Sequence, residues 1–171
     1  MSGFFQSVPL VLDPRGRCNR KGLLMIMLIT LGLQIGLGGL VAFVGFDFTG
    51  PLATAIKLAF VWVAISASIQ RLHDVGLSGW WLLWGLIGLM IWSSCVSIAG
   101  LFLLGPEVLL PFSAHFIGLF IVIYIPLLSA TLWMHFAKGE PKANRFGPVP
   151  DGSGFSSPVA AAEDISGPVP A

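Results

Sequence analysis

Long apolar runs dominate the hydropathy pattern of the chain. Four of them, each about twenty residues or longer, cover residues 23–46, 51–70, 80–104 and 111–136. An α-helix rises about 1.5 Å per residue, so roughly twenty apolar residues cross the hydrocarbon layer of a membrane, which is about 30 Å thick. The pattern therefore predicts an all-α fold, an integral membrane bundle of four transmembrane helices.

Basic residues lie almost entirely on one side of this predicted bundle. Short connections at 47–50, 71–79 and 105–110 indicate that consecutive helices pack antiparallel. Eight of the nine Lys and Arg residues then fall before the first span, between the second and third, or after the fourth. By the positive-inside rule that side is cytoplasmic, so we expect both termini in the cytoplasm.

The chain divides into four parts by composition. A basic cytoplasmic segment (1–22) precedes the membrane domain (23–136), and a cytoplasmic strip rich in Gly and Pro (137–150) follows it. The spacing of Gly and Pro in the strip is typical of turns. The tail (151–171) has too few large apolar side chains to fold alone, so we expect it to be disordered.

Overall composition excludes several classes of protein. Hydrophobic residues make up 56% of the chain and charged residues 10%, against roughly 45–50% and about 25% in soluble domains. A soluble globular protein is thereby excluded, and a net charge of +1 gives no reason to expect nucleic acid as a partner. Cys18 and Cys95 belong to an aqueous flank and a membrane span, so we expect both to be unpaired.

One cation, Lys57, lies inside a predicted span. Its long stem can carry the ammonium group to the outer headgroups. Alternatively, Lys57 lines an outward-facing pocket with Asp47, Glu107 or His115. The sequence leaves both interpretations open.

Three polar stretches lie on the predicted cytoplasmic side, at 13–22, 70–81 and 138–150. Arg71 and Asp74 are three residues apart and can pair on one helix face. His73 beside a carboxylate is a candidate proton carrier or metal ligand, but two such side chains do not complete a metal site. The candidate residues for binding lipid or a partner are Arg17, Arg20, Arg71, His73, Asp74, Trp80, Trp81, Asn144 and Arg145.

These stretches resemble three sequence elements of the DUF805 family of small bacterial inner-membrane proteins. The GRxxR element of the family corresponds to Gly16–Arg20, the RLHDxGxSGWW element to Arg71–Trp81, and the GxPxxNxYGPxP element to Gly139–Pro150. Phe146 replaces the usual Tyr of the last element, and the resemblance covers about 13–150. It implies a multi-pass protein of the bacterial inner membrane with no established activity.

The function that we predict is non-enzymatic. No HExxH, GxSxG or phosphate-binding glycine loop is present, and we expect no catalytic residues, cofactor or metal. The inner segments are predicted to form one polar cap that binds anionic phospholipid, a second copy of the chain or another membrane protein. In it Arg17 and Arg20 contact phosphates, Arg71 pairs with Asp74, and Asn144 caps backbone groups in the terminal strip.

Two alternatives from other classes stay open. One is a transporter of small molecules or ions that acts as an oligomer, because four spans alone do not surround a pathway. The other is an interfacial enzyme acting on a lipid phosphate. In that hypothesis His73 is the general base, Asp74 orients it, and Arg71, Arg17 or Arg145 holds the phosphate.

Overall fold

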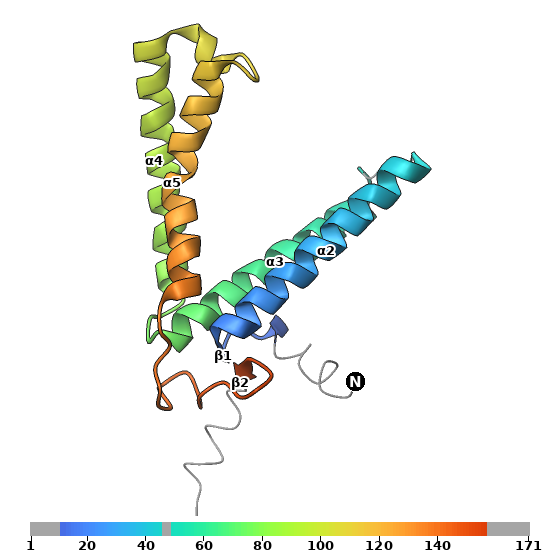
Figure 1. The fold of residues 1–171 in the computed structure, drawn as a ribbon, viewed down its shortest axis with the longest axis vertical. Coiled ribbons are helices and arrows are strands. Elements are labelled where there is room, and N and C mark those ends of the chain that lie inside the picture. Colours follow the sequence, from blue (N-terminus) through green and yellow to red (C-terminus); the bar gives the residue numbers. More distant parts are fainter. Residues whose placement is uncertain (1–10, 46–48, 157–171) are drawn as a thin grey trace, which may run out of the picture. The chain divides into compact units, whose positions relative to one another are not determined.

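Long helices make up most of the chain in the computed structural model, which describes residues 11–45 and 49–156 (Figure 1). The four helices are α2 (Arg20–Val44), α3 (Pro51–Asp74), α4 (Trp80–Leu104) and α5 (Ala114–Phe136). Three short elements complete the described part: β1 (Arg17–Cys18), η1 (Pro106–Leu109) and β2 (Phe155–Ser156). Each long helix is apolar and long enough to cross a membrane, as the hydropathy pattern predicts.

Local chemistry explains where the first helices begin and end. α2 begins at Arg20, a little earlier than predicted, because the side chain of Asn19 accepts a hydrogen bond from the backbone N of Gly22 at 2.9 Å. α3 continues one turn beyond the predicted span and ends at Asp74. The chain reverses there at Gly76, whose φ of +85° is a conformation that glycine adopts readily.

The described chain contains two compact units, each built on a helical hairpin. The first contains α2, α3 and the polar segments, and the second is residues 80–136. In the second, Trp92 Nε1 donates to the carbonyl of Val122 at 3.2 Å, and Gly100 leaves room for Leu119. A small residue at such a point lets α4 and α5 approach closely. The predicted packing of both hairpins into one four-helix bundle stays a prediction.

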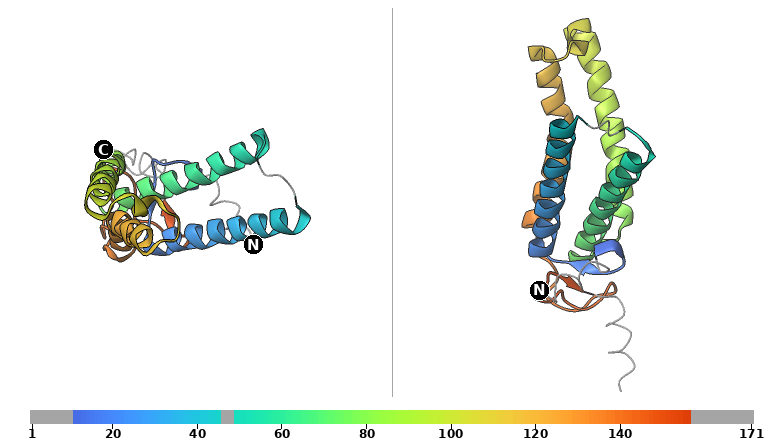
Figure 2. Two further views of the ribbon diagram at one scale, coloured as in Figure 1. Left: turned by 90° about the horizontal axis from the view of Figure 1, so that it is seen from above. Right: turned by 90° about the vertical axis from the view of Figure 1, so that its right-hand side faces the viewer.

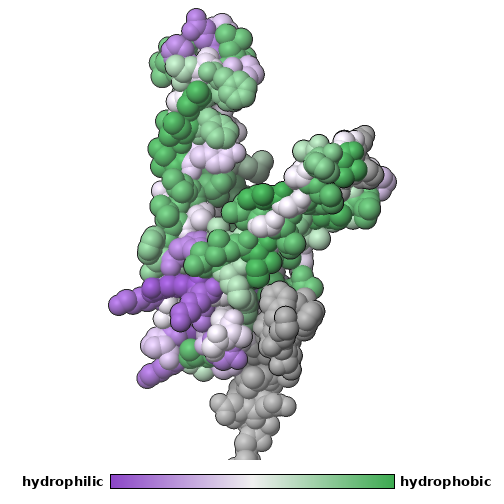
Figure 3. Space-filling view, turned by 45° about the vertical axis from the view of Figure 1, so that its right-hand side comes forward, coloured by the Kyte–Doolittle hydropathy of each residue, from purple (hydrophilic) through white to green (hydrophobic). Residues whose placement is uncertain are grey.

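Hydrophobic side chains cover most of the helix surfaces (Figure 3). In the most apolar window of each helix, at most 17% of the residues are buried. Apolar surface of this extent is not stable in water and is typical of helices that contact lipid or other membrane helices.

The polar segments of the first unit fold together at the end of the hairpin where α2 begins and α3 ends (Figures 1 and 2). We call residues 11–22, 70–79 and 137–156 the cap. Its N-terminal and C-terminal segments are joined by an antiparallel pair of strands, in which Arg17 lies opposite Ser156 and Cys18 opposite Phe155.

The strand pair corrects one prediction about the tail. We expected disorder from Asp151 onwards, but residues 151–156 form a turn and β2, and only 1% of Phe155 is exposed. The segment has too little apolar surface to fold alone, but it folds here because it packs on β1, which local composition does not reveal. Residues 157–171 lie outside the described residues.

Candidate functional site

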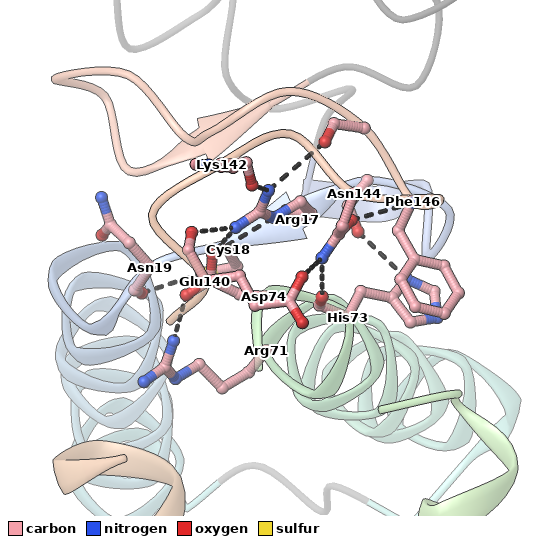
Figure 4. Close-up of polar contacts among 12 residues, drawn as sticks. Arg17, Cys18, Asn19, Arg71, His73, Asp74, Glu140, Lys142, Asn144 and Phe146 are labelled. Atoms are coloured by element: carbon pink, nitrogen blue, oxygen red, sulfur yellow. Dashed lines mark hydrogen bonds and ion pairs between the residues drawn. The ribbon is translucent and has the colours of Figure 1, made fainter. Parts of the chain in front are cut away.

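Arg17 lies at the centre of the cap and is fully buried (0% exposed). A guanidinium group has five N–H donors, and all five are used here. Nε and Nη2 donate to Oδ1 of Asp74 at 3.3 and 2.9 Å. The other three donate to the carbonyls of Glu140 (2.8 Å), Lys142 (2.8 Å) and Gly147 (3.3 Å) (Figure 4). Arg17 therefore supplies hydrogen-bond partners for an irregular backbone segment that no helix or long strand satisfies.

Asp74 lies between two arginines at the end of α3. Its Oδ2 accepts from Arg71, which is also fully buried, so the pair that the spacing predicted is confirmed. Arg71 donates in addition to the carbonyl of Ala137 at 2.6 Å, and Arg20 Nε donates to the same carbonyl at 2.8 Å. Buried ion pairs with these extra hydrogen bonds are strong, and cations near a helix C-terminus are favoured by its dipole.

The strip that follows α5 also closes the C-terminal end of α3. Asn144 Nδ2 donates to the carbonyl of His73 at 2.9 Å, and the backbone N of Glu140 donates to the carbonyl of Asp74 at 2.7 Å. Within the strip, Asn144 Oδ1 accepts from the backbone N of Phe146 at 3.0 Å. Asn144 thus caps backbone groups in the strip, as predicted, and satisfies one of the carbonyls that a helix end leaves without a partner.

The surroundings of His73 do not form the catalytic pair of the enzyme hypothesis. Its Nδ1 donates to the carbonyl of Gly16 at 3.1 Å, and its ring stacks on Phe146 with centroids 3.8 Å apart. The guanidinium of Arg145 lies 4.6 Å from the centre of the same Phe146 ring. Asp74 is engaged by two arginines and does not orient the imidazole, so the idea that Asp74 positions His73 as a base is wrong. Through its two contacts, His73 connects the end of α3 to Gly16 and to the strip.

The predicted phosphate contact of Arg17 is wrong as well, because every one of its donors is buried and already used. Arg20 differs, because it is exposed and its Nη atoms make no hydrogen bond or ion pair within the described residues. Of the two arginines expected to contact phosphate, Arg20 alone is placed to do so.

A pocket of about 400 Å³ opens in the cap beside Arg20. All three cap segments line it: Asn19, Arg20, Lys21, Arg71, Asp74, Gly139, Glu140, Pro141, Val149, Pro150, Asp151 and Gly152. Arg20 and Lys21 are exposed and lie on the first turn of α2, where the helix dipole is positive. Two exposed carboxylates of the pocket have internal partners, since Glu140 accepts from Asn144 and Asp151 from the Ser153 backbone and hydroxyl. The pocket therefore combines the exposed basic groups of Arg20 and Lys21 with the carboxylates of Glu140 and Asp151.

The comparison with protein families identifies the family of the chain. A family described as "Protein of unknown function (DUF805)" matches residues 11–148. The chain belongs to the DUF805 family. The matched region of this DUF805 protein contains Arg17, Arg71 and Asp74 with all the partners given above, whereas β2 lies beyond it. No curated protein and no solved structure matches the chain.

Trp80 and Trp81 of the DUF805 element lie in the second unit and not in the cap. They begin α4 and are 69% and 59% exposed. Exposed Trp at the end of an apolar helix is typical of the membrane interface. A shared binding role with the cap stays a prediction.

Lys57 of this DUF805 protein lines a groove of about 490 Å³ between α2 and α3, together with Gln34. Asp47 lies outside the described residues. Glu107 and His115 belong to the second unit, where Nδ1 of His115 lies 3.3 Å from Oε2 of Glu107. Both interpretations of Lys57, and the oligomeric transporter, stay predictions.

Sequence reasoning missed two residues of the cap. Gly139 has no room for a side chain, because the Asp74 carboxylate occupies the position of a Cβ. Gly139 is the first residue of the third DUF805 element, which marks the position as one to consider. The element does not show why glycine is needed there. Cys18 is fully buried beside Arg17, and burial raises the pKa of its thiol to about 12. No pattern in the sequence identifies that burial.

Proposed function

We propose that this DUF805 protein is a non-enzymatic module of the bacterial inner membrane whose cap binds the headgroup of an anionic phospholipid. The binding site is the pocket beside Arg20 and Lys21. In this proposal the cap and both termini lie in the cytoplasm, in agreement with the positive-inside rule. Alkaline phosphatase fused after Ala171 should then be inactive in intact cells, and an active fusion would contradict the orientation.

The distribution of charge on the cap supports this proposal. Six of its cations are exposed: Arg15, Arg20, Lys21, Lys138, Lys142 and Arg145. Each cation near an anionic leaflet adds about 1 kcal/mol of attraction. This general attraction brings the cap to the headgroups, but it does not determine where on the cap a headgroup binds.

The observation that carries the proposal is that Arg20 lines the pocket while only one of its nitrogen atoms, Nε, makes a hydrogen bond within the described residues. The carbonyl of Ala137 holds its Nε, so the guanidinium is partly oriented before any ligand arrives. Its two Nη atoms have no acceptor among the described residues, and paired N–H donors of this kind match two phosphate oxygens. Lys21, on the same pocket wall, adds a second charge.

Retention of lipid tests the proposal. The full chain is reconstituted in nanodiscs of equal parts phosphatidylglycerol and phosphatidylcholine, and the lipids that stay bound are counted by native mass spectrometry. The Arg20→Gln/Lys21→Gln variant should lose retained phosphatidylglycerol. Arg20→Lys, which keeps the charge and loses the fork of donors, should retain an intermediate amount.

The matched control is Lys138→Gln/Lys142→Gln, which removes the same charge from side chains that do not line the pocket. It should retain nearly as much phosphatidylglycerol as the unmodified protein. An equal loss of retained phosphatidylglycerol in both double variants would show that general surface attraction alone holds the lipid, and would contradict a specific site. No retention by the unmodified protein would refute the proposal. Displacement of the lipid by inorganic phosphate would indicate a site for the phosphate group itself.

A further inference from the structure

Residues 149–156 lie beyond the region matched by the family, and the end of this segment packs on β1 and the first turn of α2, a surface that we call the groove. We call residues 149–156 the strap. Its β2 pairs with β1, and the backbone N of Asn19 donates to the carbonyl of Gly154 at 2.9 Å. Phe155, opposite Cys18, is almost completely buried. The strap is therefore seated by both backbone hydrogen bonds and a buried aromatic ring.

Close approach of two glycines makes the groove selective. A Cβ on Gly22 would lie 2.6 Å from the carbonyl oxygen of Gly154, and a Cβ on Gly154 would lie 2.7 Å from Cα of Gly22. Gly154 also has a φ of +92°, which disfavours any residue with a side chain. At Gly152, by contrast, no described atom lies within 4 Å of an added Cβ. The groove accepts an extended segment with glycine followed by an aromatic residue.

The groove and its occupant come from different parts of the chain. β1 and the first turn of α2, which build the groove, lie within residues 11–148 matched by the family, whereas the seated residues do not. An edge strand that pairs with an extended segment distant in the sequence has the arrangement of a β-augmentation site, in which backbone bonds give affinity and side-chain pockets give specificity.

The strap also forms one wall of the pocket in the cap. Val149, Pro150, Asp151 and Gly152 line it together with family-matched residues that include Arg20 and Lys21. Because strap and anion would share this pocket, docking of one changes the surroundings of the other.

We propose that the groove formed by β1 and the first turn of α2 is a peptide-docking site, which the strap fills within the same chain. We propose further that docking of the strap completes the pocket, so that strap and anionic headgroup stabilise each other's binding. This second part rests on the proposed function above. Such coupling is reciprocal, so the headgroup must favour docking of the strap as much as the strap favours the headgroup.

Alkylation of Cys18 measures docking, because the strap covers this thiol. In full-length protein carrying Cys95→Ala, Gly154→Ala should raise the labelling rate of Cys18 by about tenfold or more, since burial of an aromatic side chain is lost. The matched control Gly152→Ala should label like its parent.

Peptide rescue then distinguishes a docking site from a simple structural contact. A synthetic peptide of residues 149–156 should restore protection of Cys18 in Gly154→Ala, and the same peptide with Phe155→Ser should not. If Gly154→Ala unfolds the helices, as judged by circular dichroism, Phe155→Leu is used in its place. The labelling rate of Cys18 should then rise by a smaller factor, and the same peptide should restore protection. Full protection in both variants, or no rescue in either, would overturn the proposal.

Lipid retention tests the coupling separately. Gly154→Ala should retain less phosphatidylglycerol than its parent with an intact strap, and phosphatidylglycerol should slow labelling of Cys18 in that parent. Equal retention by Gly154→Ala and its parent would overturn the coupling and leave the headgroup site standing. If even the unmodified protein retained no lipid, the proposed function would fail, while the peptide-docking site would still be decided by the labelling of Cys18.

Discussion

Replacing Arg17 with lysine keeps the charge at the centre of the cap and removes hydrogen-bond donors. Arg17 uses five N–H groups on five acceptor contacts, whereas a lysine ammonium has three donors. At least two of these contacts are then lost. The five contacts involve four acceptor atoms, because Oδ1 of Asp74 accepts twice, so three donors leave at least one acceptor without this partner. A buried acceptor left without a partner costs about 1–3 kcal/mol, so Arg17→Lys should destabilise the cap by at least that amount.

Labelling of Cys18 by a maleimide measures this loss in a Cys95→Ala background. The thiol is fully buried next to Arg17, so it reacts when the cap opens. A loss of about 1 kcal/mol raises the open population roughly fivefold, and the labelling rate should rise by at least that factor. Arg15→Lys is the control, because Arg15 is exposed and the substitution should leave the rate unchanged. Equal rates for Arg17→Lys and Arg15→Lys would refute the argument that donor number at Arg17 holds the cap together.

Three further predictions concern the same network. Gly139→Ala should lower stability by about 1–3 kcal/mol in thermal unfolding, because the new methyl group displaces the Asp74 carboxylate; an unchanged melting temperature would contradict this. Phe146→Tyr should melt like the unmodified protein because it keeps the stacked ring, whereas Phe146→Ser should melt lower, and equal melting of the two would show that the stack contributes nothing. The raised pKa of Cys18, from 9.0 to about 12, means that the folded state holds the thiol proton more tightly than the unfolded state. Its stabilising effect is complete below pH 9 and is lost between pH 9 and 12, by up to about 1.4 kcal/mol per pH unit in denaturant titrations; Cys18→Ala should lack this part of the slope, and an identical slope would contradict the assignment.

The helices and one ion pair could be predicted because both depend on local sequence. Each span is an apolar run of sufficient length, so hydropathy alone predicts α2 to α5. Arg71 and Asp74 meet because residues three apart share a helix face. Asn19 as an N-cap is equally local, although the prediction began α2 after it.

The roles of Arg17 and of the strap could not be predicted, because they depend on distant parts of the chain. The acceptors of Arg17 lie 57 to 130 residues away, and most are backbone carbonyls that any sequence supplies. An exposed arginine and a buried one look the same in a basic segment, which is why Arg17 was expected at lipid phosphates. Phe155 likewise lies in a tail of low hydropathy, and its partner Cys18 is more than a hundred residues distant.

The central claim is that the cap folds on Arg17 and presents a headgroup site beside Arg20. An experimental structure of the full chain in nanodiscs containing phosphatidylglycerol tests it most directly. The account predicts density for a phosphate within hydrogen-bond distance of Arg20 and Lys21, with Arg17 buried against Asp74. Headgroup density bound to Arg17 instead, with the pocket beside Arg20 holding none, would contradict it.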